Sequence, residues 1–585
     1  MADKRNLGII GVGPRGGYAL ECLVAQLIKK NSFKNLHFTL FEASGNFGGG
    51  HVYDTAQSSS NWINITERIL ELDERKEIRF KEFNIPSFPS YHDWIDHNIS
   101  REVDAYPPRR KIGKYLNQRF CSLIEPLVEK GYATMRIDKV HELQLMENKK
   151  INICTSNNTY GDFDEILLTI GHQPTKISGQ MAKWQNHVDN HNGISLFQNA
   201  YPLSNILSSQ HLDSKSIIGI RGFGLTMIDV ARRIAKEFGD FQIENKKTRE
   251  FTYAPIQKIE NLLVPFSLDG LPPVPKPLNK EIDDWFAPSA TQLDNFEILI
   301  GNGDTQKTAE DIGFLLDAFA PIAADIFLEL PKNINPNQLE QPRIEDIIKK
   351  WLKDSTLDDP AIVPQDEPVG AMMESFVGMA TGQHAISLDF CIGQVWRHCQ
   401  PSIYKQLSYS ACPDNVFAKI IMLDESTKRY SYGPPVEAIQ QLIALKKAGV
   451  LNLDYVNNPE IELVDDGWRL ANPNKSITVN IMVDSVLDQP KIKEVTSSLV
   501  RNMLSDGMIQ AVHDELGVAT DDHGYILDTS ENTLPIALLG RLAKGTVIGV
   551  DAILECFGPR ITQWAEQAAS NHNGWLQSRK PAANG

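Results

Sequence analysis

Cysteine is scarce in this chain, and its spacing excludes two common uses. The 585 residues include seven cysteines, an odd number, and no two of them form a C-x-x-C pair. A disulfide framework needs paired cysteines, and a zinc site needs clustered ligands. None of the 14 histidines falls in an H-E-x-x-H motif either. We therefore expect free thiols in a reducing compartment, no metal site and no disulfide-reductase chemistry.

Long apolar runs and an excess of positive charge are missing as well. No apolar stretch approaches the roughly 20 residues of a membrane-spanning helix, and no signal-peptide segment precedes the first apolar run. The net charge of −16 disfavours nucleic acid and anionic membrane as partners. We expect a cytoplasmic protein of two or three domains that acts on a small molecule.

A glycine motif near the start is the most informative feature present. Residues 7–10 form a short apolar run that leads into G-x-G-x-x-G at Gly11, Gly13 and Gly16, and a helical pattern follows. The first glycine permits a tight turn, the second lets the backbone approach a pyrophosphate, and the third lets the helix pack against the strand. The sequence therefore predicts strand, turn and helix in a dinucleotide-binding arrangement.

Other residues near this motif extend the predicted site. Pro14 and Arg15 fall in the first helical turn, whose free N–H groups attract phosphate. A strand predicted over residues 36–41 ends at Glu42, a carboxylate placed to accept ribose hydroxyls, 26 residues beyond the last motif glycine. Gly49 and Gly50 in the next loop would let the backbone lie against a flat ring. The alternatives are a glycine turn without ligand and a merely flexible loop.

A second unit of the same kind begins near residue 216. An apolar run over 216–221 leads into Gly222, Gly224 and Thr226, and a helical pattern follows. Met227 occupies the place of the third glycine, where close packing is usual. We predict a nicotinamide-nucleotide site here; a vestigial domain that only supports the first unit is the alternative.

These motifs resemble two-dinucleotide-binding flavoproteins. More narrowly, the chain resembles a family of FAD/NAD(P)-binding proteins through three further segments: Pro-Pro-Arg-Arg at 107–110, Gly-Leu-Thr-Met-Ile-Asp at 224–229 and Leu-Gly-Arg-Leu-Ala-Lys-Gly-Thr at 539–546. The resemblance implies FAD on the first unit and NAD(P)H on the second. It adds to the expected cofactor-binding residues Gly171, at the end of a buried strand, and Gly540, Gly545 and Thr546, in a late turn before a short helix at 549–554.

The expected fold is α/β, with two Rossmann-type dinucleotide-binding domains and an inserted, mainly helical region. Residues 1–210 form the first part of the FAD-binding domain, and 211–300 form the second, NAD(P)-type unit. Residues 301–450 form the helical region, and 451–585 supply strands that return to complete the FAD domain.

The resemblance favours an NAD(P)H-using monooxygenase that N-hydroxylates a small amine or amino acid. An anionic substrate needs guanidinium groups, which bind carboxylates with two hydrogen bonds. The candidates are Arg109, Arg110 and Arg397, and each has a surface or structural ion-pair role as its alternative. Two other functions stay open: a flavin dehydrogenase or oxidase that does not activate oxygen, and a non-catalytic dinucleotide-binding scaffold.

Overall fold

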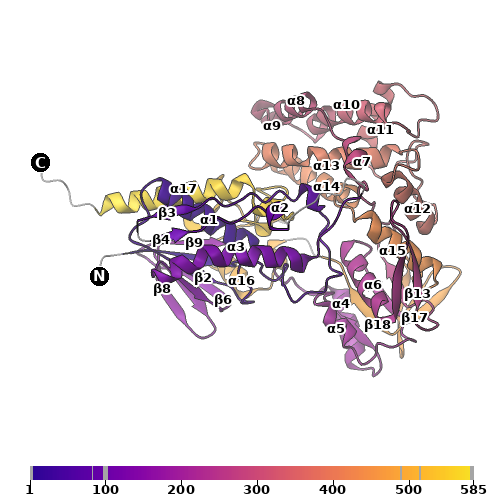
Figure 1. Cartoon of the computed structure of the whole chain (residues 1–585), viewed down its shortest axis with the longest axis horizontal. Coiled ribbons are helices and arrows are strands. Elements are labelled where there is room, and N and C mark those ends of the chain that lie inside the picture. The colour runs from indigo at the N-terminus through magenta and orange to yellow at the C-terminus, as the bar shows by residue number, and fades with distance from the viewer. Residues whose placement is uncertain (1–3, 82, 96–102, 488–490, 513–515, 580–585) are drawn as a thin grey trace, which may run out of the picture.

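Three lobes make up the molecule (Figure 1). The computed structural model describes residues 4–81, 83–95, 103–487, 491–512 and 516–579. Two lobes are built on separate sheets whose long strands run parallel, and the third consists of helices. This arrangement confirms the expected α/β class with two Rossmann-type units and a helical insertion.

The first lobe contains a six-stranded sheet, in which only the edge strand β19 runs antiparallel. In spatial order its strands are β19 (Tyr525–Leu527), β20 (Thr533–Leu538), β9 (Glu165–Leu168), β1 (Arg5–Ile10), β2 (Leu36–Phe41) and β5 (Ala133–Arg136). The central strands β9 and β1 are buried on both faces and apolar after their first residues, as a parallel sheet covered on both sides requires. At their start, Arg5 and Glu165 form a buried ion pair.

Different elements cover the two faces of this sheet. On one face, Leu167 of β9 packs in a core with helices α1 (Pro14–Lys29), α3 (Arg109–Glu129) and α17 (Pro559–Ser578). On the other face, Ile166 and Leu168 pack against three antiparallel strands and one helix. These are β6 (Val140–Leu145), β7 (Ile151–Thr155), β8 (Thr159–Phe163) and α16 (Ser498–Ser505). A small hairpin, β3 (Ile78–Phe80) and β4 (Phe83–Ile85), and the short helix α2 (Tyr91–Trp94) complete the lobe.

The second lobe contains a four-stranded parallel sheet. Its order is β10 (Ser195–Phe197), β18 (Ile481–Asp484), β11 (Ile218–Arg221) and β14 (Leu263–Phe266). The other elements are α4 (Gly179–Asp189), α5 (Leu203–Leu207), α6 (Leu225–Phe238), β12 (Gly239–Asn245), β13 (Glu250–Pro255), β15 (Glu460–Val464), β16 (Gly467–Ala471) and β17 (Ser476–Val479).

The two glycine turns repeat one backbone arrangement. In the first lobe Ile10 pairs with Phe41, and the N–H of the next residue, Gly11, donates to the Phe41 carbonyl oxygen at 2.8 Å. In the second lobe Arg221 pairs with Phe266, and Gly222 N–H donates to Phe266 at 2.7 Å.

One part of the expected domain organisation is wrong. Residues 451–585 do not all return to the first sheet, because β18 inserts between β10 and β11 of the second. Strand β10, expected in the first domain, lies in the second sheet too. The apolar side chains of Ile481 and Val483 complete the second core, a pairing that strand patterning alone does not specify. Only β19 and β20 rejoin the first sheet.

The helical lobe begins somewhat earlier than the sequence indicates, at residue 280. It comprises α7 (Lys280–Asp284), α8 (Ala290–Ile300), α9 (Gly303–Thr308), α10 (Gly313–Glu329), α11 (Gln341–Lys353), α12 (Val369–Ala380), α13 (Leu388–Leu407), α14 (Asp414–Ser431) and α15 (Val436–Lys447). Among the described residues, no helix has the length and apolar character needed to cross a bilayer.

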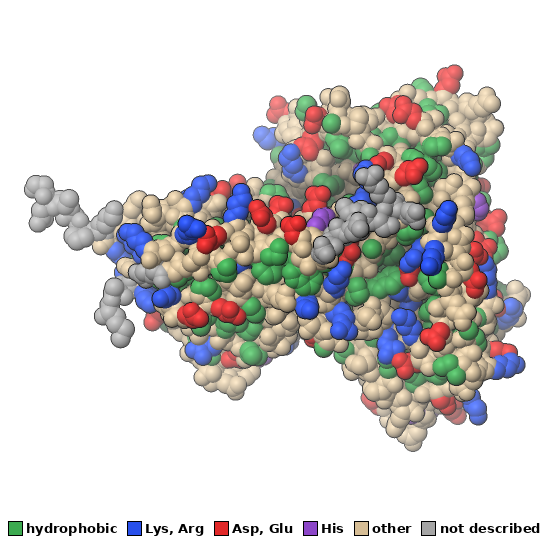
Figure 2. Space-filling model, in the orientation of Figure 1, with side chains coloured by type: hydrophobic (Ala, Val, Ile, Leu, Met, Phe, Trp, Pro, Cys, Tyr) green, Lys and Arg blue, Asp and Glu red, His purple; other side chains and the backbone are tan. Residues whose placement is uncertain are grey.

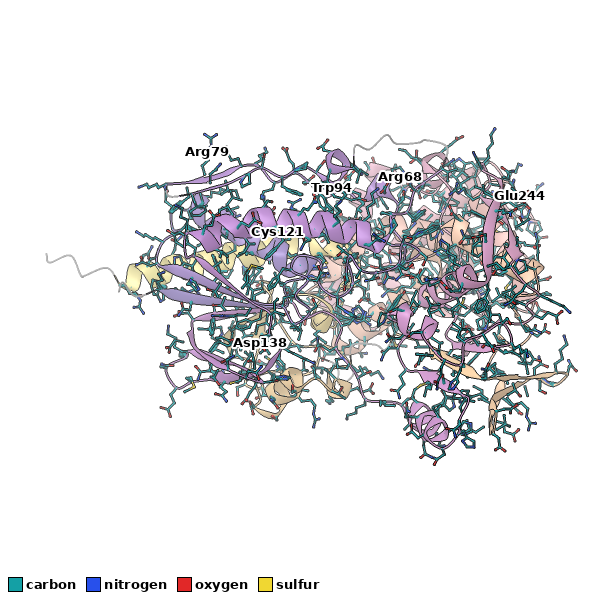
Figure 3. All side chains as sticks on the ribbon, turned by 60° about the horizontal axis from the view of Figure 1, so that its bottom comes forward. Arg68, Arg79, Trp94, Cys121, Asp138 and Glu244 are labelled. Atoms are coloured by element: carbon teal, nitrogen blue, oxygen red, sulfur yellow. The ribbon has the colours of Figure 1, made fainter. Side chains whose placement is uncertain are left out.

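A buried carboxylate ties α1 to its neighbours in the first lobe. Glu21 of α1 accepts hydrogen bonds from Arg119 of α3 at 2.6 and 3.1 Å and from Arg75 at 3.2 Å. All three side chains are at least nine-tenths buried. The pair of Arg79 and Glu77 is exposed by contrast, and Figure 3 shows Arg79 pointing outward.

Glu21→Gln is expected to destabilise the protein by about 3–5 kcal/mol, because it leaves two buried guanidinium groups without a counter-charge. The matched change Glu77→Gln removes an exposed pair and should leave the stability nearly unchanged. Urea unfolding of both variants measures the difference. Equal losses would mean that the buried cluster does not hold α1 in place.

Candidate functional site

The first glycine turn is built as the motif predicts. Gly11 has φ +86°, and a Cβ on Gly16 would lie 2.3 Å from the Gly11 carbonyl oxygen. Both positions therefore exclude larger residues for structural reasons. A Cβ on Gly13 would lie 3.5 Å from the Gly50 Cα, an ordinary van der Waals contact, so the protein itself does not exclude a small side chain at this position.

A second glycine loop lies against this turn. Gly48 N–H donates to the Val12 carbonyl oxygen at 2.7 Å, and the Asn46 side-chain amide donates to the Gly50 carbonyl oxygen at 2.6 Å. A Cβ on Gly50 would lie 3.1 Å from the Gly13 Cα. Gly49 lies between Gly48 and Gly50 in the sequence, and a Cβ added to it would lie 2.9 Å from the Asn46 side-chain amide nitrogen. The two loops form a backbone cradle at the start of α1, where no side chain caps the helix.

Glu42 lies at the edge of this cradle. Its carboxylate is buried and accepts hydrogen bonds from Val12 N–H at 2.8 Å and from the Ser44 hydroxyl at 2.6 Å. These bonds hold the carboxylate beside the turn, at the end of β2. Ser44 N–H also donates to the same oxygen, Oε1, at 3.1 Å, so both lone pairs of Oε1 are used. Among the described residues Oε2 accepts from Val12 N–H alone, and it can still accept a hydrogen bond from a hydroxyl.

The strand end at Gly171 opens toward a large cavity. Gly171 has φ +62° and no atom within 4 Å of an added Cβ. The next residue, His172, lines the cavity. Burial, aided by Arg541, lowers the pKa of His172 to about 4, so its imidazole is neutral at pH 7.

The residues of the late turn at 540–546 lie in two different environments. Gly540, with φ +115°, lies against Arg15, whose guanidinium donates to the Val550 carbonyl oxygen at 3.2 Å. Gly545 instead faces the side chain of Leu516. The Thr546 hydroxyl donates to the Val518 carbonyl oxygen at 3.1 Å.

Gly545 and Thr546 thus stabilise the turn from its inner side and do not line the cavity. Residues 549–553 are not helical, contrary to expectation; a short 3-10 turn covers Leu554–Cys556, and α17 begins at Pro559.

The second glycine turn faces open space. Gly222 has φ +105°, and an added Cβ on Gly224 would meet no atom within 4 Å. Gly224 precedes α6, and no side chain caps this helix either. Thr226 is buried and lines the cavity, whereas Met227 is fully buried in the core. The bulky residue at the third glycine position therefore leaves the turn clear.

A cavity of about 1820 Å³ lies where the three lobes meet. Its wall includes His51 and His172, which lie near the first glycine turn, and Gly222 and Gly224, which belong to the second. The helical lobe contributes part of the wall. Acidic and basic side chains are mixed over the outer face shown in Figure 2. Acidic and basic side chains also line the cavity.

All three candidate arginines line this cavity, in different states. The Arg109 guanidinium lies 3.5 Å from the Asp229 carboxylate and over the Tyr201 ring. Arg110 is exposed. Arg397 forms an ion pair with Asp283. Arg109 and Arg397 thus each have a carboxylate neighbour within the protein.

Asp283 is the centre of a charged cluster at the helical end of the cavity. Arg68 donates to it at 3.0 Å, His398 contacts it at 3.2 Å, and Arg397 is its third partner. Burial acts to raise the pKa of Asp283, but Arg397 and His398 outweigh burial and lower it. Figure 3 shows Arg68 where the first lobe approaches the others.

Lys276 is a further cavity residue that the sequence analysis does not identify. It is 7% exposed, and its ammonium donates to the Asn64 carbonyl oxygen. Burial, with a contribution from Arg397, lowers its pKa to about 7. The sequence signal was indirect: the residue is flanked by Pro275 and Pro277, which fix its backbone.

Comparison with known proteins agrees with this geometry. Residues 8–173 match the family described as FAD-NAD(P)-binding. The chain is 25% identical over 231 residues to nitrosuccinic acid synthase of Aspergillus oryzae, a stretch that covers 38% of this chain and only 34% of that protein.

Solved structures give remote likenesses. L-lysine 6-monooxygenase from Pseudomonas syringae has a TM-score of 0.44 at 12% identity, covering 97% of this chain and 99% of that one. A cyclohexanone monooxygenase mutant from Rhodococcus sp. Phi1 bound to NADP+ has a TM-score of 0.45 at 11% identity, covering 98% and 87%. Likenesses at this level identify neither a reaction nor a substrate. The match over residues 8–173 covers the same part of the chain as the glycine cradle.

Proposed function

We propose that this protein is an FAD-dependent, NAD(P)H-using monooxygenase that N-hydroxylates a small amine or amino acid. The observation that carries the proposal is the shared cavity, which is lined by Gly222 and Gly224 of the second turn and by His51 and His172, at the ends of the two segments that pack against the first turn. Hydride transfer requires the nicotinamide and the flavin to meet, so two nucleotide sites that open into one space suit this reaction.

The residues of the first turn fit FAD. The uncapped start of α1 and the absence of a side chain at Gly13 suit a pyrophosphate, and Glu42 stands at the strand end that faces a ribose. Bound FAD would supply hydride acceptance and oxygen activation. The protein would hold it through the backbone of the two glycine loops, with Arg15 and Gly540 at the far side of the turn.

The second turn fits a nicotinamide nucleotide in the same way. Gly224 leaves open space at the uncapped start of α6, and Thr226 faces the cavity. Met227 is buried in the core and does not obstruct this space.

The chemistry of the cavity wall suits a polar, charged substrate. The neutral His172 can accept a hydrogen bond from a substrate N–H, although its lowered pKa makes it a poor proton acceptor at pH 7. The relative named nitrosuccinic acid synthase supports an amino dicarboxylate, because nitrosuccinic acid is a dicarboxylate whose nitrogen bears oxygen. We therefore place aspartate first among the amines to test.

Incubation of the purified yellow protein with NADPH, oxygen and aspartate tests the proposal. The expected result is substrate-dependent oxygen uptake and an amino acid heavier by one oxygen atom in the mass spectrum. Hydride loss from the substrate without added oxygen would indicate a dehydrogenase or oxidase. A protein that stays colourless with excess FAD would contradict the proposal altogether.

Gly13→Ala is expected to lower FAD affinity about tenfold or more, equivalent to about 1.4 kcal/mol, because the added methyl group would keep a pyrophosphate from approaching the backbone of the turn. The fold should persist, since the nearest protein atom is 3.5 Å away. Flavin retained after gel filtration and the melting temperature measure the two effects. Gly574→Ala, in α17 with no atom within 4 Å, is the matched control and should keep its flavin. Full retention by Gly13→Ala would contradict the assignment.

Gly224→Val is expected to spare FAD binding and to slow flavin reduction by NADPH about tenfold or more, a change of about 1.4 kcal/mol in the barrier. The side chain would project into the open space before α6, where the second nucleotide is proposed to bind. Stopped-flow absorbance of the flavin follows the reduction. Unchanged reduction rates at subsaturating NADPH would show that this turn does not bind the nucleotide.

A further inference from the structure

We infer that Lys276 anchors a carboxylate of the substrate in the shared cavity, so that the substrate class is an amino acid and not a simple amine. The inference rests on the proposed function only in taking this cavity as the substrate site.

The backbone around Lys276 is held rigidly. Prolines occupy positions 273, 275 and 277, where no N–H is available. Each intervening N–H donates to the helical lobe or its connections: Val274 to the Arg429 carbonyl oxygen, Lys276 to Pro434 and Leu278 to Ala380, at 2.9–3.0 Å. We call residues 271–278 the proline strap. It presents the lysine side chain from a fixed position on the cavity wall.

The ammonium group of Lys276 is buried and incompletely partnered. It has three donors, and within the described ranges its one hydrogen-bond acceptor is the Asn64 carbonyl oxygen. It forms no ion pair with any described residue. Two other cavity lysines differ: Lys428 contacts Asp551 and Glu425, and Lys544 contacts Glu425.

Nearby charges do not supply the missing partner. The charged groups that act on Lys276 are Arg397 of α13 and Asp283 of α7. Four further residues belong to the same cluster through their interactions with these two or with one another: Arg68, Asp104, Tyr106 and His398. Arg68 occupies Asp104 with two hydrogen bonds of 2.8 and 3.0 Å. Asp283 is shared by Arg68, Arg397 and His398.

The charges in this group therefore do not balance. Two carboxylates face two guanidinium groups and one ammonium, which leaves one positive charge when the lysine is protonated and His398 is neutral. A ligand carboxylate supplies the missing negative charge and accepts the free N–H donors. A simple alkylammonium ligand would add another positive charge to this end of the cavity.

Proton uptake should accompany this binding. With the pKa of Lys276 at about 7, the free lysine is mostly neutral at pH 8. A carboxylate binds the protonated form, so each pH unit above 7 should weaken binding about tenfold. Below pH 7 the lysine is already protonated, and this dependence should disappear.

Succinate is the probe for the test, because it carries carboxylates but no amine to be oxidised. Calorimetric titration of the FAD-loaded protein with succinate between pH 6.5 and 9 should show the tenfold weakening per pH unit above 7. Lys276→Met should weaken binding at pH 6.5 about tenfold or more and remove the dependence on pH. The apolar side chain replaces an unpaired buried charge, a change that folded proteins tolerate. The melting temperature and bound flavin check this.

Lys280→Met is the matched control, because Lys280 is exposed and paired with Asp284 four residues further on. It should bind succinate as the unmodified protein does. Affinity that is independent of pH in the unmodified protein, or unchanged in Lys276→Met, would overturn the inference. Loss of NADPH-coupled amine oxidation with an intact, Lys276-dependent succinate profile would overturn the proposed function and leave the carboxylate anchor standing.

Discussion

The close approach of α1 to β1 is the constraint on which the site depends. Backbone meets backbone where Gly16 faces the Gly11 carbonyl oxygen, and no side chain fits between them. This contact directs the uncapped start of α1 toward the loop at Gly50 and fixes Val12 N–H against Glu42. The contact between Gly16 and Gly11 therefore determines both how α1 packs on the sheet and where its free N–H groups point.

The three lobes contribute separately to the shared cavity. The first lobe supplies the cradle and a neutral histidine, and the second supplies an open glycine turn. The helical lobe supplies the acid Asp283, around which cations gather.

The sequence predicts local structure in this protein better than long-range pairing. The glycine motif could be predicted because each position has a local requirement. Gly11 permits a turn, Gly13 leaves room for a pyrophosphate to approach, and Gly16 allows a close packing contact. Strand β18 could not, because an apolar run fits either parallel sheet and tertiary packing decides between them. Gly545 and Thr546 were implied by resemblance, yet they face the interior side of their turn. Lys276 needed the fold, since nothing in a proline-rich segment shows which charges will surround its lysine.

The placement of β18 also affects how the chain is made. Arg221 of β11 pairs with Asp484, 263 residues further along the chain. During synthesis, β11 and α6 leave the ribosome long before the strand that completes their sheet. At about 5–20 residues per second, the second lobe would wait some tens of seconds with an open edge. In nascent chains of this protein, the edge of β11 thus stays open to incorrect strand pairing until β18 is synthesised, and a chaperone has time to bind it.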